Sequence, residues 1–355
     1  SDALSLKTPL KTTTLTVTIT DTVDNIASNL AALQTAAKAK SIASITIPAP
    51  ASGTAKPTFS ITAAQLKASP ELLATIKGDY DLTITGVAAA DAVTVAGNAD
   101  KVLSKSGSLS TYSKIVISDT SANLVKNIAA LETAATAGRL TSITVSDDKA
   151  LVLTEAQIKA DGHFLATQFT TKTNVEAKAV AAADVISVQS LVNANANLML
   201  TKESIADTAA NIQSNLDNLE TAVKASTASS ASNAFTIANI GITDKGSITV
   251  TNNTLVNDID ALKVLTGKYT LNVTDIGVAD AIALKAPSKD ATLAISVKDT
   301  AANIAGNWDK LQTAAKAKTI TSITVTDSAS SLLSMTAAQL KADADALKLV
   351  AGDYK

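Results

Sequence analysis

Apolar residues follow two alternating periods along this chain. Downstream of Asp21, the residues Ile26, Leu30 and Leu33 fall at i, i+4 and i+7, which places them on one stripe of a helix. The segment after each such stripe alternates β-branched apolar residues with Thr or Ser, the period-2 pattern of a half-buried strand. These strands are predicted at Ile42–Ile47, Leu140–Val145, Phe235–Thr243 and Ile320–Val325. The pattern therefore predicts an α/β chain.

The helix-and-strand pattern occurs in four copies. Each opens on an Asp-Thr pair, carries two asparagines and an apolar stripe, and reaches Thr-Ala before its strand; the copies begin at Asp21, Asp119, Asp207 and Asp299. A second unit places a Thr where a helix N-cap is expected, at Thr62, Thr154, Thr251 and Thr336. A third, shorter unit follows, first as Gly86-Val-Ala-Ala-Ala-Asp. Three strand–helix units thus form one super-repeat of about 90 residues.

Strand–helix–strand units with short connections favour parallel strands. Stacked at this period they predict a solenoid, similar in plan to leucine-rich repeats, with a mostly parallel sheet on one side and helices on the other. One alternative stays open, because Ile242–Val250 is equally compatible with a tight hairpin and hence a mixed sheet. The domain prediction is one continuous solenoid, with a strand or arm at 1–14, repeats at 15–118, 119–206 and 207–298, and a partial repeat at 299–355.

Composition narrows the classes of function. Apolar residues make up 46% of the 355 residues and aromatic residues only 3%, so Ala, Val, Ile and Leu must form a core of many thin layers. The net charge of −2 offers no basic surface for nucleic acid or anionic lipid. The absence of cysteine excludes disulfides and thiolate metal sites. The sequence contains no apolar run of about 18 residues, so no membrane-spanning helix is expected. The chain opens without a basic and apolar leader, as expected of a mature product or an excised fragment.

Little in the sequence points to catalysis or to a cofactor. His163 is the only histidine, so no His-based triad or multi-His metal site can form. No nucleophile elbow, P-loop or Rossmann glycine pattern is present. Acidic pairs without repeat equivalents, which favour solvated surface and leave calcium as an alternative, occur at Asp147–Asp148, Asp258/Asp260 and Asp343/Asp345. We therefore expect no enzymatic activity and no resident cofactor.

The paired asparagines are the most regular polar feature of the repeat. Asn is a mediocre helix former, so its recurrence beside the apolar stripe needs a structural reason. We expect the amides to bond backbone groups of neighbouring coils and to fix the register between coils; a row of amides that binds a glycan is the alternative. These residues are Asn25, Asn29, Asn123, Asn127, Asn211, Asn215, Asn303 and Asn307.

The two ends of the sequence suggest how copies associate. The chain stops at Gly352-Asp-Tyr-Lys, which matches Gly78-Asp-Tyr-Asp just before a predicted strand, so the last coil is expected to lack its closing strand. An open sheet edge is a template for another chain, and Ser1–Thr14 could supply the strand by β-augmentation. The residues expected at this contact are Leu4, Leu6, Leu10, Leu15, Val17, Leu349 and Tyr354.

The repeat resembles a known class of protein through the segments Asp207–Leu219, Leu140–Val145, Ile320–Val325 and Leu153–Gln157. These are similar to the Thr/Ala-rich tandem repeats of very large secreted bacterial surface proteins of the RTX or haemolysin type, and the resemblance covers roughly residues 15–355. It implies a secreted, cell-surface or extracellular-matrix setting, including biofilm matrix, with an adhesive or scaffolding role. The calcium signature of that family, a glycine-rich nonapeptide, is missing from this sequence, so calcium loading by that route is not expected.

Two functions of different classes remain. The leading hypothesis is an extracellular structural protein that assembles head to tail with copies of itself into a filament, surface layer or matrix fibre, because a heterologous contact that does not close grows into a filament. The alternative is an adhesin segment that binds a surface glycan or a protein receptor through two inserted loops, Pro48–Pro57 and Ser226–Asn233.

Overall fold

The computed structural model describes residues 15–106, 113–228, 235–327, 332–342 and 344–351. Contacts divide the chain into two compact units. Unit 1 comprises Ser1–Val175 and Leu191–Met199, and unit 2 comprises Glu176–Ser190 and Leu200–Lys355.

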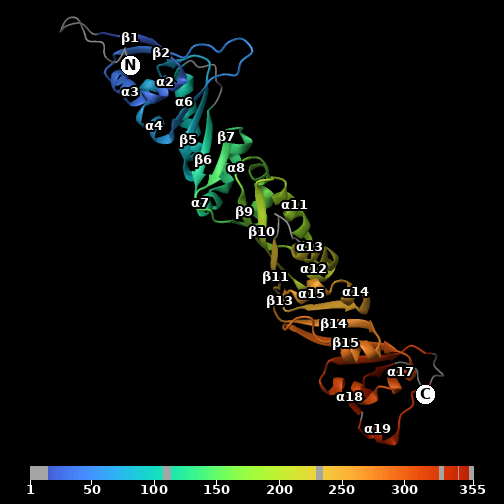
Figure 1. Cartoon of the computed structure of the whole chain (residues 1–355). Coiled ribbons are helices and arrows are strands. Elements are labelled where there is room, and N and C mark those ends of the chain that lie inside the picture. The colour runs from blue at the N-terminus through green and yellow to red at the C-terminus, as the bar shows by residue number, and fades with distance from the viewer. Residues whose placement is uncertain (1–14, 107–112, 229–234, 328–331, 343, 352–355) are drawn as a thin grey trace. The chain divides into compact units, whose positions relative to one another are not determined.

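Strands alternate with short helices throughout the chain (Figure 1). The elements up to Thr167 are β1 (Val17–Thr20), α2 (Val23–Ser28), α3 (Leu30–Lys38), β2 (Ile42–Thr46), β3 (Thr58–Thr62), α4 (Ala63–Ala68), α5 (Pro70–Leu73), β4 (Ile76–Lys77), β5 (Asp81–Val87), the 3-10 turn η1 (Ala89–Asp91), α6 (Ala92–Ser106), β6 (Lys114–Asp119), α7 (Ser121–Lys126), α8 (Ile128–Thr136), β7 (Leu140–Val145), β8 (Leu151–Thr154), α9 (Glu155–Ala160) and α10 (Gly162–Thr167).

The remaining elements repeat the same order. They are β9 (Thr173–Val180), η2 (Ala182–Asp184), α11 (Val185–Asn193), β10 (Leu198–Asp207), α12 (Ala209–Ser214), α13 (Leu216–Ala228), β11 (Thr236–Ile242), β12 (Ser247–Thr251), α14 (Asn252–Asn257), α15 (Ile259–Lys263), β13 (Leu265–Thr266), β14 (Tyr269–Ile276), α16 (Val278–Ala283), β15 (Ala291–Asp299), α17 (Ala301–Ala305), α18 (Trp308–Lys316), β16 (Ile320–Val325), α19 (Ala337–Ala342), α20 (Ala344–Leu347) and β17 (Val350–Ala351).

The sheets within each unit are parallel, which confirms the predicted α/β class. In unit 1, β1, β2 and β4 form one sheet, and β3, β5, β6 and β7 form a second. In unit 2, β10, β11 and β13 are neighbours, and β12, β14, β15, β16 and β17 form a further sheet. The hairpin alternative is wrong, because β11 and β12 belong to different sheets.

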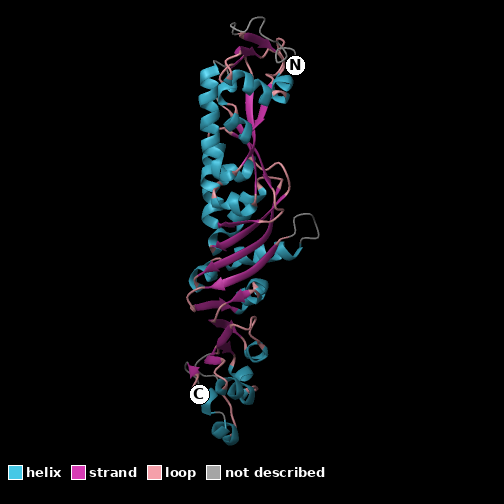
Figure 2. Cartoon of the chain, turned by 90° about the vertical axis from the view of Figure 1, so that its left-hand side faces the viewer, coloured by secondary structure: helices cyan, strands magenta, loops and turns pink. Residues whose placement is uncertain are grey.

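The core lies between one face of each sheet and the helices beside it. In β5 the apolar side chains of Leu82 and Ile84 are buried, whereas Thr83 and Thr85 on the other face are half-exposed, as the period-2 pattern predicts. Helix α6 packs on β5 and β6 and also contacts α8. Figure 2 shows helices lying alongside the strands within each unit. Burial of small aliphatic side chains therefore holds each layer together, with about 0.8 kcal/mol for each buried methylene group.

The helix predicted downstream of Asp21 is two helices, α2 and α3, in the structure. Thr22 caps α2 by accepting a hydrogen bond from the Asn25 backbone N–H, and α2 ends at Asn29, whose φ of −107° and ψ of 14° leave the helical region. The apolar stripe survives the break, since Ile26 and Leu30 are both buried. The expected Thr caps are confirmed at Thr62, Thr154, Thr251 and Thr336, whose hydroxyl groups accept hydrogen bonds from the backbone N–H three residues on.

Candidate functional site

The residues expected at a head-to-tail contact fall at two described places. Leu15 and Val17 are half-buried at the start of β1, which is the edge strand of its sheet, and Leu349 is half-buried just before β17. Four of the expected residues lie outside the described part of the chain: Leu4, Leu6, Leu10 and Tyr354.

Two apolar positions are more accessible to solvent in one copy than in the others. Val17 is half-buried, whereas its counterparts Ile115 and Ile295 are 0% and 1% exposed. On α19, Leu340 is 54% exposed. The counterparts of Leu340 are core residues: Leu66, Ile158 and Leu255, which are 6%, 0% and 4% exposed. The side chain at this position is therefore buried in three copies and exposed in the fourth. The periodicity of the sequence does not predict this difference.

The paired asparagines do not connect neighbouring coils, contrary to our expectation. The first Asn of each pair donates its side-chain N–H to the Asp that opens the same copy, as from Asn303 Nδ2 to Asp299 Oδ1 at 2.7 Å. The second donates to the backbone carbonyl of the first, as from Asn307 to Asn303 at 2.9 Å. The other three copies repeat both bonds. The side-chain amide of each Asn finds an acceptor four residues earlier in its own segment. The first Asn of a pair therefore positions the Asp, and the second lies at the end of the first helix.

The aspartate that opens a copy makes the bond to a neighbouring element. Asp119, at the end of β6, accepts at Oδ2 the backbone N–H of Ala89, the first residue of η1, at 2.9 Å. The equivalent bonds run from Ala182 to Asp207 at 3.0 Å and from Val278 to Asp299 at 2.8 Å. Burial alone would raise the pKa of these carboxyl groups, but the bonds from the Asn amide and from backbone N–H groups together lower it below its usual value.

Loss of one such carboxylate is expected to lower the free energy of unfolding of unit 2 at pH values above the acid range. Replacing Asp299 by Ala should lower the free energy of unfolding at pH 7 by about 1–2 kcal/mol, because the N–H of Val278 loses its partner. The lowered pKa makes this contribution present above the unfolded pKa of about 3.9 and lost as the pH falls below it. Urea unfolding at pH 7 and pH 2.5, followed by fluorescence of buried Trp308, measures the difference. The control is Asp309→Ala on exposed α18 surface; an equal cost for both variants would contradict the assignment.

A second set of aspartates bonds the start of the helix that follows the Asp-Thr pair in the second, third and fourth copies. The Ser121 N–H donates to Asp147 Oδ1 at 3.0 Å, and the same bond recurs from Ala209 to Asp244 at 3.1 Å and from Ala301 to Asp327 at 2.6 Å. The backbone bond from Ser121 lowers the pKa of Asp147. Asp147 is half-buried, and like Asp244 and Asp327 it stands two residues after the end of its strand, so the expectation that it has no repeat equivalents is wrong.

Four polar side chains, three of them buried and one (Glu132) half-buried, connect a helix of one unit to a helix of the next. Each stands after the last leucine of the stripe, in the sequence Leu-Gln/Glu-Thr-Ala, and accepts the backbone N–H of the third residue of α5, α10, α15 or α20. We call them the bridging residues: Gln34, Glu132, Glu220 and Gln312. Their bonds, to Leu72, Phe164, Ala261 and Ala346, measure 3.0, 2.7, 2.7 and 2.8 Å. The bridging residues make the bonds between units that we had expected of the asparagines. In the sequence, the recurrence of Gln or Glu at this position in all four copies indicated this role.

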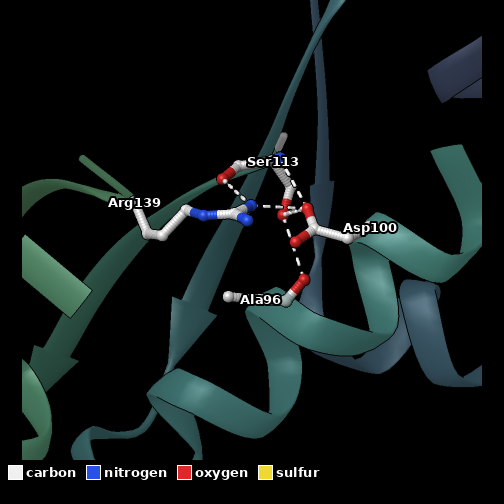
Figure 3. Close-up of polar contacts among 4 residues, drawn as sticks. All are labelled: Ala96, Asp100, Ser113 and Arg139. Atoms are coloured by element: carbon white, nitrogen blue, oxygen red, sulfur yellow. Dashed lines mark hydrogen bonds and ion pairs between the residues drawn. The ribbon is translucent and has the colours of Figure 1, made fainter. Parts of the chain in front are cut away.

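One charged cluster in unit 1 is internally satisfied (Figure 3). Arg139 Nη1 lies 2.6 Å from Asp100 Oδ1, which also accepts the Ser113 backbone N–H at 2.9 Å. The Ser113 hydroxyl donates to the Ala96 carbonyl at 3.2 Å. Burial would raise the pKa of Asp100, but the Arg139 guanidinium and the Ser113 bonds lower it. The Asp100 carboxylate is paired with Arg139 and bonded to Ser113, so it is suited to joining α6 to the following strands. The same bonds make it unsuited to act as a base.

Glu203 is a carboxyl group at a position that isoleucine occupies in two other copies of the repeat. It occupies, in β10, the position of Ile115 in β6 and Ile295 in β15, and its side chain is fully buried. Gln189 on α11 donates to its Oε2 at 2.8 Å, and Oε1 has no partner. Burial raises its pKa to about 7, although the Gln189 bond opposes this.

The described residues bring together no arrangement typical of catalysis. Among them no group of three or more His, Cys, Asp or Glu side chains could hold a metal ion, and His163 lies exposed on α10. Asp258 is buried rather than solvated, and burial together with the nearby Asp217 and Glu220 raises its pKa. Within the described segments, no helix combines the length and the apolar character needed to cross a membrane. The recurrent polar groups are bonded to backbone N–H groups, so what the arrangement can do is join units.

Comparison with protein-family models and with curated proteins found no match for this chain, so its function has to be inferred from its own residues.

Proposed function

We propose that this chain is an extracellular structural repeat protein whose strand–helix units continue as a solenoid, and whose copies assemble head to tail into a filament, surface layer or matrix fibre. The secreted, cell-surface or matrix setting is the one that the resemblance of the repeats implies. No step of the proposal requires a cofactor or calcium.

The observation that carries the proposal is the exposure of Leu340, supported by the partial exposure of Val17. Other copies of the repeat bury the side chains at these two positions. A unit of the same pattern supplied by a second copy could cover them, since the counterparts Leu66 and Ile115 are buried within unit 1. A contact that joins one face of a molecule to a different face of the next extends into a filament when the rotation between copies does not close a ring.

The bridging residues support the same proposal. Both Gln and Glu serve at this position, and each bonds a backbone N–H, a group that every residue except proline provides. A joint of this kind depends little on the side chains of the neighbouring unit. Units from different copies can therefore meet with the same bonds as units of one copy.

Charged substitutions at Leu340 and at Val17 are expected to prevent assembly. Leu340→Lys and Val17→Lys should each raise the concentration needed for association at least about tenfold, because a buried unpaired ammonium is unfavourable at an apolar contact. Sedimentation velocity over a concentration series, with negative-stain electron microscopy, measures this. The matched control is Val256→Lys, since Val256 is 65% exposed and its counterparts Lys67 and Lys159 are lysines. Monodisperse wild-type protein at high concentration would contradict the proposal.

The adhesin alternative places the function in the two inserted loops. Residues 48–57 form an exposed connection between β2 and β3, while most of the Ser226–Asn233 loop lies outside the described residues. Replacing residues 48–57 by a short Gly-Ser linker should leave assembly unchanged under our proposal. Loss of binding to a glycan array or to a receptor, with assembly intact, would favour the adhesin.

A further inference from the structure

A groove runs between α4–α5 and α6 in unit 1. It has a volume of about 680 Å³, and apolar side chains such as Leu66, Val95 and Val102 line much of it. Small-molecule sites typically have volumes of roughly 300–1,000 Å³ and mostly apolar walls with a few polar groups. The groove follows α6 from Thr94 to Val102, which is about 12 Å at the rise of an α-helix. This length suits an extended chain better than a compact ring.

Two lysines, Lys67 on α4 and Lys101 on α6, also line this groove. Both are exposed, and none of the ion pairs formed by the described residues includes either of them. The one acidic residue of the lining, Asp91, precedes α6 and lies about 15 Å from Lys101 along the helix axis. The groove therefore combines an apolar trough with ammonium groups that have no anionic partner among the described residues.

The repeat provides a counterpart of this groove in unit 2 that lacks the lysines. It lies between α14–α15 and α16, has a volume of about 410 Å³, and is lined by Leu255 and Leu284 at the positions of Leu66 and Val95. Val256 stands there in place of Lys67, and α16 ends at Ala283, so no residue of that helix corresponds to Lys101. The same scaffold thus presents one groove lined by two lysines and one lined by none.

We propose that the groove of unit 1 binds a single-chain amphipathic anion, an alkyl carboxylate, with its chain along α6 and its carboxylate at Lys67 and Lys101. The apolar wall removes the alkyl chain from water, which provides most of the affinity. The lysines select the sign of the head group, because an ammonium head would meet like charge. A peptide would need partners for its backbone groups, and the lining offers few beyond Thr94 and Asn98.

The test is calorimetric titration of the full chain with sodium decanoate below its critical micelle concentration, with decyltrimethylammonium as the matched cation. We expect one decanoate site per chain, with the cation binding at least about tenfold more weakly. Lys67→Glu and Lys101→Glu should each weaken decanoate binding about tenfold, and Val95→Trp, which fills the trough, should abolish it. Lys126→Glu on exposed α7 is the control and should bind as the wild type does. Circular dichroism and thermal melting establish that each variant is folded.

Three results would overturn the proposal. The first is absence of decanoate binding to the wild type. The second is binding that the Lys67, Lys101 and Val95 variants leave unchanged, or that the cationic amphiphile matches. The third is self-association of the protein that Val95→Trp removes while decanoate does not compete, since a second copy of the chain would then occupy the groove. None of these outcomes depends on whether Leu340→Lys prevents head-to-tail assembly.

Discussion

Replacing Glu203 by Gln is expected to stabilise unit 2 at pH 8 by as much as about 3 kcal/mol and to leave its stability at pH 4 nearly unchanged. The folded protein holds the proton of Glu203 with a pKa of about 7, whereas a glutamate in an unfolded chain releases it near 4.3. The folded state therefore binds more protons between these values, and wild-type stability falls as the pH rises through this interval. Each unit of difference in pKa corresponds to about 1.4 kcal/mol.

Urea unfolding between pH 4 and pH 8 measures this effect, with fluorescence of Trp308 as the probe of unit 2. Glu203→Ile should also flatten the pH profile, because isoleucine occupies this position in β6 and β15, although it leaves the Gln189 amide without its acceptor. The control is Glu176→Gln, which removes a half-exposed carboxyl group of β9. A wild-type profile that does not decline between pH 5 and pH 8, or a decline that survives in Glu203→Gln, would contradict the assignment.

Replacing the bridging residue Glu220 by Leu is expected to lower the free energy of unfolding of unit 2 by about 2–3 kcal/mol. The substitution leaves the buried N–H of Ala261 without an acceptor, and a buried donor without a partner costs about 1–3 kcal/mol. It also removes the ion pair in which Lys224 Nζ lies 3.0 Å from Glu220 Oε1. Because that lysine is exposed, the pair itself should add only up to about 1 kcal/mol.

The matched variant is Glu220→Gln, which should change stability by less than about 1 kcal/mol. Gln312 shows why: its side-chain oxygen accepts the N–H of Ala346 at 2.8 Å, the same bond without a charge. The glutamine also removes a negative charge beside Asp258, whose pKa Glu220 helps to raise. Urea unfolding at pH 7 compares the two variants, with the dependence of free energy on urea checked for a constant slope. Equal losses for Gln and Leu would show that the acceptor does not matter.

The candidate site was only partly predictable from the sequence. The fourfold Asn pairs and Asp-Thr pairs identified the polar positions that matter, but not which of them bond a neighbouring element. Asp119 bonds Ala89, thirty residues earlier, and Glu132 bonds Phe164, thirty-two residues later. Both partners are backbone N–H groups, which carry no sequence signature. The Asn amides instead found acceptors within four residues, and a nearby acceptor in a helix is reached at little cost in chain entropy.

The sequence by itself determined the α/β class, the places of the principal helices and strands, and the Thr caps, because each depends on periods and residues within one short segment. Only the tertiary structure decided that β11 and β12 enter different sheets, that Glu203 is buried without a charged partner, and that Leu340 is surface where Leu66 is core. Those outcomes depend on which unit lies against which. A repeated sequence pattern is the same whether its neighbour is present or not, whereas burial, and with it the pKa of a carboxyl group or the exposure of a leucine, is set by that neighbour.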